Sequence, residues 1–393
     1  METTAGFDGL VCTDCGSTHD ATPGRCPDCG GALLVEYDPD GVTRDSLADR
    51  RFDGLGRYER FLPVPADRLV TMDEGTTPLV SCPDFADRLG VEAVYVKDEG
   101  ANPTGSTADR GMAVAVAAAR DHGAEQVALP TTGDAGQSAA AYAARADIES
   151  EAFVPTRSTF VAKAMTNVHG GEMSVVEGRY PDAVAAFEDA MAGEDDAGHS
   201  LAPFDTPYRQ EGAKTLLCEV AEQLDWSLPD AVVHPTGDGL GVVGSHLAAR
   251  QLVATDLVDE TPALHVAQPV ECAPVVAADD AGADDTDPWE RPDTLVGALE
   301  VPDPAGGALA LDAVRETGGW ALGVSDDDAL EAAVALAGEG VEASATGGVG
   351  AAAALELAKG GHLDGDDTVV LVNPVAGNKE NDVLRSHLMR RGV

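Results

Sequence analysis

Four of the seven cysteines have the spacing of a metal site. Cys12 and Cys15 form one Cys-x-x-Cys pair, and Cys26 and Cys29 form a second. Thiolates in two such pairs bind Zn²⁺ in a tetrahedron, and a module with little core gains its folding energy from the metal. Disulfide bonds are the alternative, and a cytosolic location disfavours them. We therefore predict a zinc ribbon at residues 1–40.

The other residues of ligand type are predicted to lie outside this site. His19 falls between the two pairs, and we expect it to face solvent because four sulfurs already complete a tetrahedron. The remaining cysteines are predicted to be small buried apolar residues. They are Cys82, Cys218 and Cys272.

Three glycine-containing turns each precede an expected helix and could hold an anion. Backbone amides approach an anion closely at glycine, and the amino terminus of a helix adds a favourable dipole. Taken singly, such glycines are more often a packing requirement than a phosphate site. The turns are Gly105-Ser106, Thr131 to Gly136, and Gly237 to Gly241.

Short apolar runs typical of strands alternate with helical patterns along most of the chain. The strands are predicted at residues 93–96, 126–129, 152–154, 173–176, 231–233, 264–266 and 369–372. The helices are predicted at residues 109–120, 137–145, 183–191 and 329–337, with glycines 347–350 at the start of another. Repeated strand–helix units imply parallel sheets covered on both faces, with ligands at the carboxyl ends of the strands. Residues 273–294, rich in aspartate, are predicted to be a solvated loop.

The order and spacing of the three turns resemble the threonine synthase family of pyridoxal-phosphate enzymes. Residues 97–111 resemble the segment in which that family carries Ser-Phe-Lys-Asp-Arg-Gly, whose lysine forms the Schiff base with the cofactor. Thr131 to Arg145 resembles the family's Thr-Gly-Asn-Thr turn and the helix after it, and Gly237 to Gly244 resembles its phosphate-binding loop. Residues 339–342 and 377–379 are similar to later landmarks. An amino-terminal zinc ribbon also occurs in archaeal threonine synthases.

The resemblance implies the fold and its domains. The expected class is α/β, with two three-layer domains built on parallel sheets, as in fold type II pyridoxal-phosphate enzymes and the β subunit of tryptophan synthase, plus the ribbon. A large domain is expected at residues 41–115 and 226–393, and a small one at residues 116–225. Carried over by resemblance, the cofactor-binding positions are Asp134, Gly237, Gly239 and Gly241.

The departures from the family pattern fall on positions that contact the cofactor. Ala108 stands at the lysine position, and a methyl group forms no imine. Asp134 and Asp238 stand where the family has asparagine, Leu240 where it has glycine, and Pro374 where it has a hydroxyl that bonds the pyridine nitrogen. Adaptation to salt could explain the two aspartates, but it explains none of the other three changes. We therefore predict a degenerate pocket that has lost pyridoxal phosphate.

Another lysine would have to supply the imine if catalysis persists. Lys97 is the nearest candidate in sequence, and its default role is a salt bridge with Glu99 or another acid. Lys163 and Lys379 are further candidates, the first in a helix of the small domain and the second near the carboxyl-terminal loop. None of the three replaces the missing residue by position.

The net charge of the chain limits the partners and the location that we expect for it. The 393 residues carry a formal net charge of -44, from 69 acidic and 25 basic residues. Such a surface repels nucleic acid and anionic membranes. High net charge also occurs in disordered chains, but a hydrophobic content of 44% favours an ordered protein adapted to molar salt. We expect a halophilic cytoplasmic protein, since neither a signal-peptide pattern nor an apolar run of about 18 residues is present.

Three functions follow as hypotheses. The first is a threonine-synthase-like pseudoenzyme that binds a small anionic or amino-acid-like ligand and acts as a binding or regulatory protein. The second is a working lyase with a relocated lysine, which converts O-phosphohomoserine to threonine and phosphate as the resemblance implies. The third is a structural partner of a genuine family enzyme. A homo- or hetero-oligomer is expected, because the fold type commonly forms dimers.

Overall fold

The computed structural model describes residues 1–38, 41–48, 54–192 and 198–392. The chain divides into two compact units. The first unit comprises Met1–Thr76, Ala108–Glu219 and Leu247–Asp259. The second comprises Thr77–Thr107, Val220–His246 and Glu260–Val393. Helices α8 (Thr215–Gln223) and α9 (Leu240–Ala254) contribute residues to both units. The domain limits expected from sequence stay predictions, and residue 40 lies outside the described residues.

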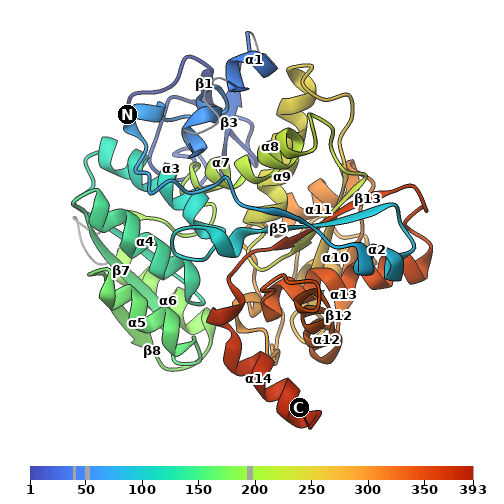
Figure 1. Cartoon of the computed structure of the whole chain (residues 1–393). Helices are drawn as coiled ribbons and strands as arrows, with labels where there is room; N and C mark the ends of the chain where they lie inside the picture. Colours follow the sequence, from blue (N-terminus) through green and yellow to red (C-terminus); the bar gives the residue numbers. More distant parts are fainter. Residues whose placement is uncertain (39–40, 49–53, 193–197, 393) are drawn as a thin grey trace. The chain divides into compact units, whose positions relative to one another are not determined.

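The first unit is built on a four-stranded parallel sheet with the order β8-β7-β6-β9. Its strands are β6 (Gln126–Pro130), β7 (Glu149–Pro155), β8 (Glu172–Val176) and β9 (His199–Ser200). Successive side chains of a strand point to opposite faces. Ala152 and Val154 accordingly join the core formed with α3 and α4, whereas Phe153 joins a second cluster with Phe187 of α6. Helices therefore cover both faces, as the green part of Figure 1 shows.

The helical segments of the first unit include those predicted at residues 109–120, 137–145 and 183–191. They are α1 (Arg44–Ala48), α3 (Ala108–Asp121), α4 (Asp134–Arg145), α5 (Phe160–Val168), α6 (Tyr180–Ala192) and α7 (Arg209–Ala213), with 3-10 turns η1 (Gly54–Phe61) and η2 (Ala66–Arg68). Helix α3 is rich in alanine because residues 109–119 are all buried, which leaves little room for larger side chains.

The amino-terminal segment forms a small three-stranded antiparallel sheet with the order β2-β1-β3. These strands are β1 (Phe7–Cys12), β2 (Thr18–His19) and β3 (Leu33–Tyr37). Its core is small and includes two of the four spaced cysteines. The buried core residues are Leu10, Cys12, Cys26, Leu33 and Val35.

The second unit is built on a six-stranded sheet with the order β12-β11-β10-β13-β5-β4. Five strands run parallel, and the edge strand β4 is antiparallel to β5. The strands are β4 (Leu79–Ser81), β5 (Ala93–Asp98), β10 (Ala231–Pro235), β11 (Ala263–Pro269), β12 (Ala321–Val324) and β13 (Thr368–Asn373). Interior strands of a parallel sheet are buried on both faces, which explains the continuous apolar run of β13.

Two helices of the second unit begin at serine caps. In α12 (Asp326–Ala337), Ser325 accepts a hydrogen bond from Asp328 N, and in α13 (Ala345–Gly360), Ser344 accepts one from Gly347 N. Helix α13 thus begins before its glycines. At Gly348 a Cβ atom would lie 2.1 Å from Ala329 O, so glycine is needed there for the close contact between α12 and α13.

The remaining segments of the second unit include one correction to the sequence analysis. They are α2 (Pro83–Leu89), α10 (Pro274–Ala281), α11 (Gly307–Glu316), α14 (Asn381–Arg390) and the 3-10 turns η3 (Glu99–Ala101), η4 (Gly297–Leu299) and η5 (Gly377–Lys379). The acidic loop predicted at 273–294 was wrong in its first part, because α10 begins there with Pro274 in its first turn and buries Val275 and Ala278. Among the described residues, no helix combines the length and apolarity that a membrane span requires.

Candidate functional site

The four spaced cysteines lie together at one end of the amino-terminal sheet. Their sulfur atoms are all within 4.8 Å of one another. The Cys12 and Cys29 Sγ atoms are 3.4 Å apart, and those of Cys15 and Cys26 are 3.8 Å apart. A zinc tetrahedron with Zn–S bonds of about 2.3 Å has edges of about 3.8 Å. The cluster therefore has the dimensions of a zinc site.

His19 borders this cluster, which corrects the expectation that it faces solvent. Its side chain is only 15% exposed, because the strand β2 turns it toward the cysteines. The Nε2 atom is 2.8 Å from Ser17 Oγ and 3.4 Å from Cys26 Sγ. The Ser17 hydroxyl in turn lowers the pKa of the Cys15 and Cys26 thiols, that of Cys26 to about 5. Thiolate is the form that binds metal.

The predicted pocket residues divide between the two units. Ala108 and Asp134 lie in the first unit, and Lys97, with the glycines of the 237–241 turn, lies in the second.

Ala108 is the first residue of α3 and is half-buried. The next residue, Asp109, is fully buried, and its Oδ1 accepts a 2.6 Å hydrogen bond from the hydroxyl of Ser138 on α4. Carboxylates near a helix amino terminus are stabilised by the dipole, as expected for Asp109. The bond to Ser138 fixes the first turn of α3 against α4.

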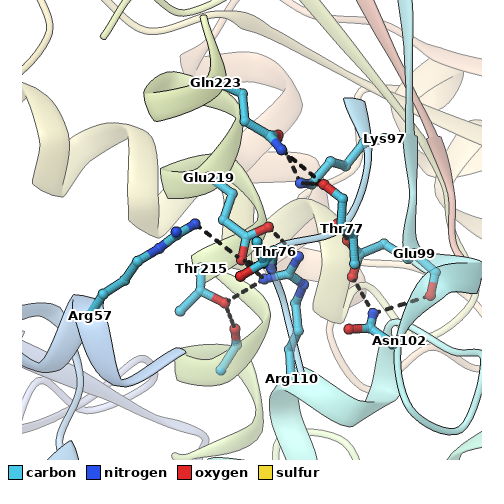
Figure 2. Close-up of polar contacts among 11 residues, drawn as sticks. Arg57, Thr76, Thr77, Lys97, Glu99, Asn102, Arg110, Thr215, Glu219 and Gln223 are labelled. Atoms are coloured by element: carbon cyan, nitrogen blue, oxygen red, sulfur yellow. Dashed lines mark hydrogen bonds and ion pairs between the residues drawn. The ribbon is translucent and has the colours of Figure 1, made fainter. Parts of the chain in front are cut away.

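Arg110 forms a fully buried ion pair with Glu219 of α8. Its two terminal nitrogens are 3.0 and 2.8 Å from the two Glu219 oxygens, and Nη1 also donates to Thr215 Oγ1. The backbone N–H of Thr76 donates to Glu219 at 2.7 Å, and Arg57 Nη2 lies 3.7 Å from the same carboxylate (Figure 2). The acidic partner of Arg110 thus belongs to a helix that is distant in the sequence.

The turn before α4 is capped by its own threonine. The Thr131 hydroxyl oxygen accepts hydrogen bonds from the N–H groups of Gly133 and Gly136 at 2.9 and 3.3 Å. The Thr131 side chain thus occupies two backbone donors of this turn. Helix α4 begins at Asp134, three residues earlier than predicted and at the position expected to contact the cofactor.

The glycine turn at residues 237–241 follows β10 and leads into α9. Asp238 Oδ1 accepts a 3.0 Å hydrogen bond from Leu240 N, so a carboxylate of the chain itself lies at the amino terminus of this helix. Leu240 is buried, with 9% of its surface exposed. Burial lowers the pKa of the neighbouring His234 to about 3, which keeps its imidazole neutral.

Lys97 is the last buried residue of β5, and its amine is fully enclosed. Nζ donates hydrogen bonds of 2.9 Å to Thr77 O and to Gln223 Oε1 (Figure 2). Thr77 also donates from its hydroxyl to Glu99 Oε1, and Asn102 donates to the other Glu99 oxygen. These contacts indicate that Lys97 anchors the loop that follows β5.

The other lysines lie in varied settings. Lys163 donates to Thr156 O at the protein surface, and Lys359 pairs with Glu356. Lys214 is buried beside Glu211. Lys379 lies against the segment that precedes Ala108, since a Cβ atom at Gly105 would lie 3.3 Å from its Cε.

A polar group at the carboxyl end of β13 was missed by the sequence analysis. Asn373 donates to Asp98 Oδ1 at the end of the neighbouring strand β5, at 2.8 Å. Its own Oδ1 accepts from the N–H and the hydroxyl of Ser344. Pro374 O accepts a 2.8 Å hydrogen bond from Thr107 N. The sequence contained a signal for this contact, because Asp98 and Asn373 lie just after the ends of two strands that were predicted to be parallel.

Comparisons with known proteins agree with this architecture. Residues 70–374 match the family described as pyridoxal-phosphate dependent enzyme. The threonine synthase of Methanocaldococcus jannaschii is 32% identical over 380 residues, covering 94% of this chain and 93% of that protein. The threonine synthase of Methanosarcina acetivorans is 33% identical over 370 residues, covering 92% and 90%.

Solved structures show the same fold at lower identity. A processed form of threonine deaminase isoform 2 from Solanum lycopersicum superposes with a TM-score of 0.69 at 20% identity, covering 90% of this chain and 91% of that one. Maize serine racemase gives a TM-score of 0.68 at 17% identity, covering 89% and 98%. These likenesses concern the fold alone. The α/β class, the two parallel-sheet domains and the four-cysteine cluster predicted from sequence are confirmed.

Proposed function

The chain belongs to the pyridoxal-phosphate-dependent enzyme family and is a homologue of threonine synthases, and from this premise we propose that it is a pseudoenzyme. In this proposal it has lost Schiff-base catalysis and acts as a binding or regulatory protein for a small anionic or amino-acid-like ligand. The observation that carries the proposal is Ala108, which begins α3 where the resemblance expects the imine lysine. A methyl group cannot replace the amine in covalent capture of an aldehyde.

The two helix amino termini that could hold a phosphate support the proposal. The Asp238 carboxylate lies at the start of α9, where it accepts the hydrogen bond from Leu240 N. A second negative group there would be repelled. The Thr131 hydroxyl oxygen likewise accepts hydrogen bonds from two backbone N–H groups at the start of α4. Side chains of the chain itself therefore use donors that a bound dianion would need.

The carboxyl end of β13 supports the same conclusion. Pro374 has no side-chain donor or acceptor for a pyridine nitrogen. The polar side chain beside it, Asn373, is engaged with Asp98 and Ser344. These residues are a poor fit for pyridoxal phosphate, and we derive no step through that cofactor.

A working lyase with a relocated lysine is the second candidate, favoured by identity with threonine synthases across most of the chain. Lys97 would have to give up two hydrogen bonds inside the protein to act as the imine lysine. Lys379 is the better placed of the two, because it lies against Gly105 in the segment that leads to Ala108.

One experiment separates the two functions. The full chain is purified in molar KCl, mixed with pyridoxal phosphate, scanned for absorbance, treated with borohydride and mapped by peptide mass spectrometry. We expect no aldimine band and no reduced adduct on any lysine. A stoichiometric adduct on Lys97 or Lys379 would contradict the pseudoenzyme, and loss of that adduct in Lys97→Ala or Lys379→Ala would identify the residue.

We also propose that the four-cysteine cluster holds one Zn²⁺. The mutual distances of the sulfurs support it. Elemental analysis of the purified chain should find about one zinc per chain. Cys26→Ser should release it, whereas Cys82→Ser, at a buried cysteine outside the cluster, should not. A chain that contains no metal and takes up none would overturn this assignment.

A further inference from the structure

The amino-terminal ribbon, residues 7–37, contacts one short segment of its own unit, residues 204–214. On the surface, Arg25 Nε lies 2.7 Å from Asp205 Oδ1. Nearer the core, the Tyr208 hydroxyl donates a 2.9 Å hydrogen bond to Thr22 O, in the loop between the two cysteine pairs. Both partners in the segment precede α7, so the ribbon contacts the entry to that helix.

The buried part of the contact is an ion pair covered by a ribbon tyrosine. Glu211 lies in the middle of α7 and Lys214 directly after its end, and each is 1% exposed. The Tyr37 hydroxyl donates a 2.6 Å hydrogen bond to Glu211 Oε2, and Lys214 Nζ lies 3.8 Å from the centre of the Tyr37 ring. Gln210 also donates to Leu33 O. Charged groups that are buried away from water depend on such partners, because an uncompensated buried charge is strongly destabilising.

The same segment contacts the first turn of α3. At Gly212 a Cβ atom would lie 1.9 Å from Arg110 O, so the two backbones meet at a distance that only glycine permits. Arg110 is two residues after Ala108. The ribbon, α7 and the first turn of α3 therefore form one continuous series of contacts within the first unit.

The ribbon has too little apolar core to keep this arrangement without metal. Its five buried core residues include Cys12 and Cys26, two of the four sulfur ligands. Modules of this size fold with their metal and unfold when it is removed. Unfolding of the ribbon would withdraw Tyr37 from Glu211 and Lys214 and expose the ion pair to water.

We propose that metal occupancy of the four-cysteine site controls the order of residues 204–214 and, through Gly212, of the first turn of α3. The ribbon is then a metal-dependent support for the helix that begins at Ala108. The inference rests on the zinc assignment but not on whether the protein is a pseudoenzyme.

Hydrogen exchange of the intact chain, followed by mass spectrometry, tests this before and after metal removal with a chelator. Metal content is measured on the same samples. We expect faster exchange in residues 7–37, 204–214 and 108–112 after metal loss, with α12 and α13 of the second unit unchanged. Faster exchange in the ribbon alone would overturn the coupling while leaving the zinc assignment intact. A chain unable to hold metal would overturn both.

Tyr37→Phe tests the contact with zinc still bound, so that an unfolded ribbon does not confuse the result. The substitution removes the hydroxyl that donates to Glu211 and keeps the ring. We expect residues 204–214 to exchange about tenfold faster, as the loss of one hydrogen bond to a buried charge predicts. Tyr95→Phe makes the same chemical change in β5 of the second unit and should leave that segment unchanged. Equal exchange rates of residues 204–214 in Tyr37→Phe and Tyr95→Phe would count against the proposal.

Discussion

At the scale of single residues, the ion pair of Arg110 and Glu219 places two charges in the interior of the first unit. Both side chains are fully buried, and each Glu219 oxygen accepts from Arg110. A buried pair of this kind adds less to stability than its geometry suggests, because desolvation opposes the attraction. Removal of one partner is costly, since the other charge remains buried.

Glu219→Gln should therefore destabilise the protein by about 3 to 5 kcal/mol. The glutamine would keep the shape of the side chain, but its NH2 group would face another donor, either Arg110 or Thr76 N. Thr76 N now donates to the Glu219 carboxylate. Urea unfolding in molar KCl measures the change. Glu356→Gln, in an exposed pair with Lys359, is the matched control and should have little effect. Equal effects in the two variants would show that burial of the first pair does not matter.

A site could be predicted from the sequence where its chemistry fixes the spacing of its residues. The interaction partners of individual side chains could not be predicted. The two Cys-x-x-Cys pairs indicated the cluster because four ligands lie within one short segment. Glu219 could not be assigned to Arg110, because 109 residues of chain separate them. The contact between Tyr37 and Glu211, which are 174 residues apart, was equally hidden. Such pairs depend on how the helices pack.

At the scale of elements, strands buried on both faces were predictable and short edge strands were not. The apolar runs of β10, β11 and β13 stand out because helices contact both faces of their sheet. Strand β12 was missed because Ala-Leu-Gly-Val carries a weak strand signal, and β9 because it has two residues. Helix α10 was missed because its aspartates obscured an apolar face.

Two histidines on the adjacent strands β10 and β11 should make the second unit sensitive to mild acid. Burial lowers the pKa of His234 to about 3, and burial, with a smaller effect of His362, lowers that of His265 to about 4. A histidine with a lowered folded-state pKa favours the neutral form, so its stabilising contribution is complete above about pH 6.5 and falls as the pH drops toward 4. Each histidine should cost about 1.4 kcal/mol per pH unit in that range.

Urea unfolding between pH 7 and pH 5 tests this, in a range where most carboxylates remain ionised. His234→Gln should make stability less dependent on pH. His169→Gln, at the half-buried carboxyl-terminal end of α5 in the first unit, is the same substitution outside the second unit and serves as the comparison. His265 is less suitable for substitution because its Nδ1 accepts a hydrogen bond from Trp320 N. A wild-type slope of zero would contradict the role of these imidazoles.

At the scale of the whole molecule, charge is the dominant property. Acidic residues outnumber basic ones by 69 to 25, giving the net charge of -44. Even if every basic residue were paired with one acidic residue, as Arg110 is with Glu219, 44 acidic residues would have no basic counterpart, since 69 minus 25 is 44. Most of the acidic residues therefore act on one another through water and salt, and their repulsion opposes the compact state.

The protein should accordingly require salt for stability. Raising KCl from 0.1 M to about 1 M shortens the Debye length from about 10 Å to about 3 Å, which screens carboxylates on the surface from their neighbours. If screening contributes about 3 kcal/mol, the melting temperature should rise by about 4 °C, because an unfolding entropy of about 2.1 cal/mol/K per residue amounts to roughly 0.8 kcal/mol/K for the whole chain. Calorimetry over a KCl series measures it, with glycine betaine as the uncharged control. Betaine adds no screening, so an equal gain in betaine would assign the effect to solute exclusion. A flat response to KCl would mean that the surface acids are already compensated, and the prediction of a salt-adapted protein would then be wrong.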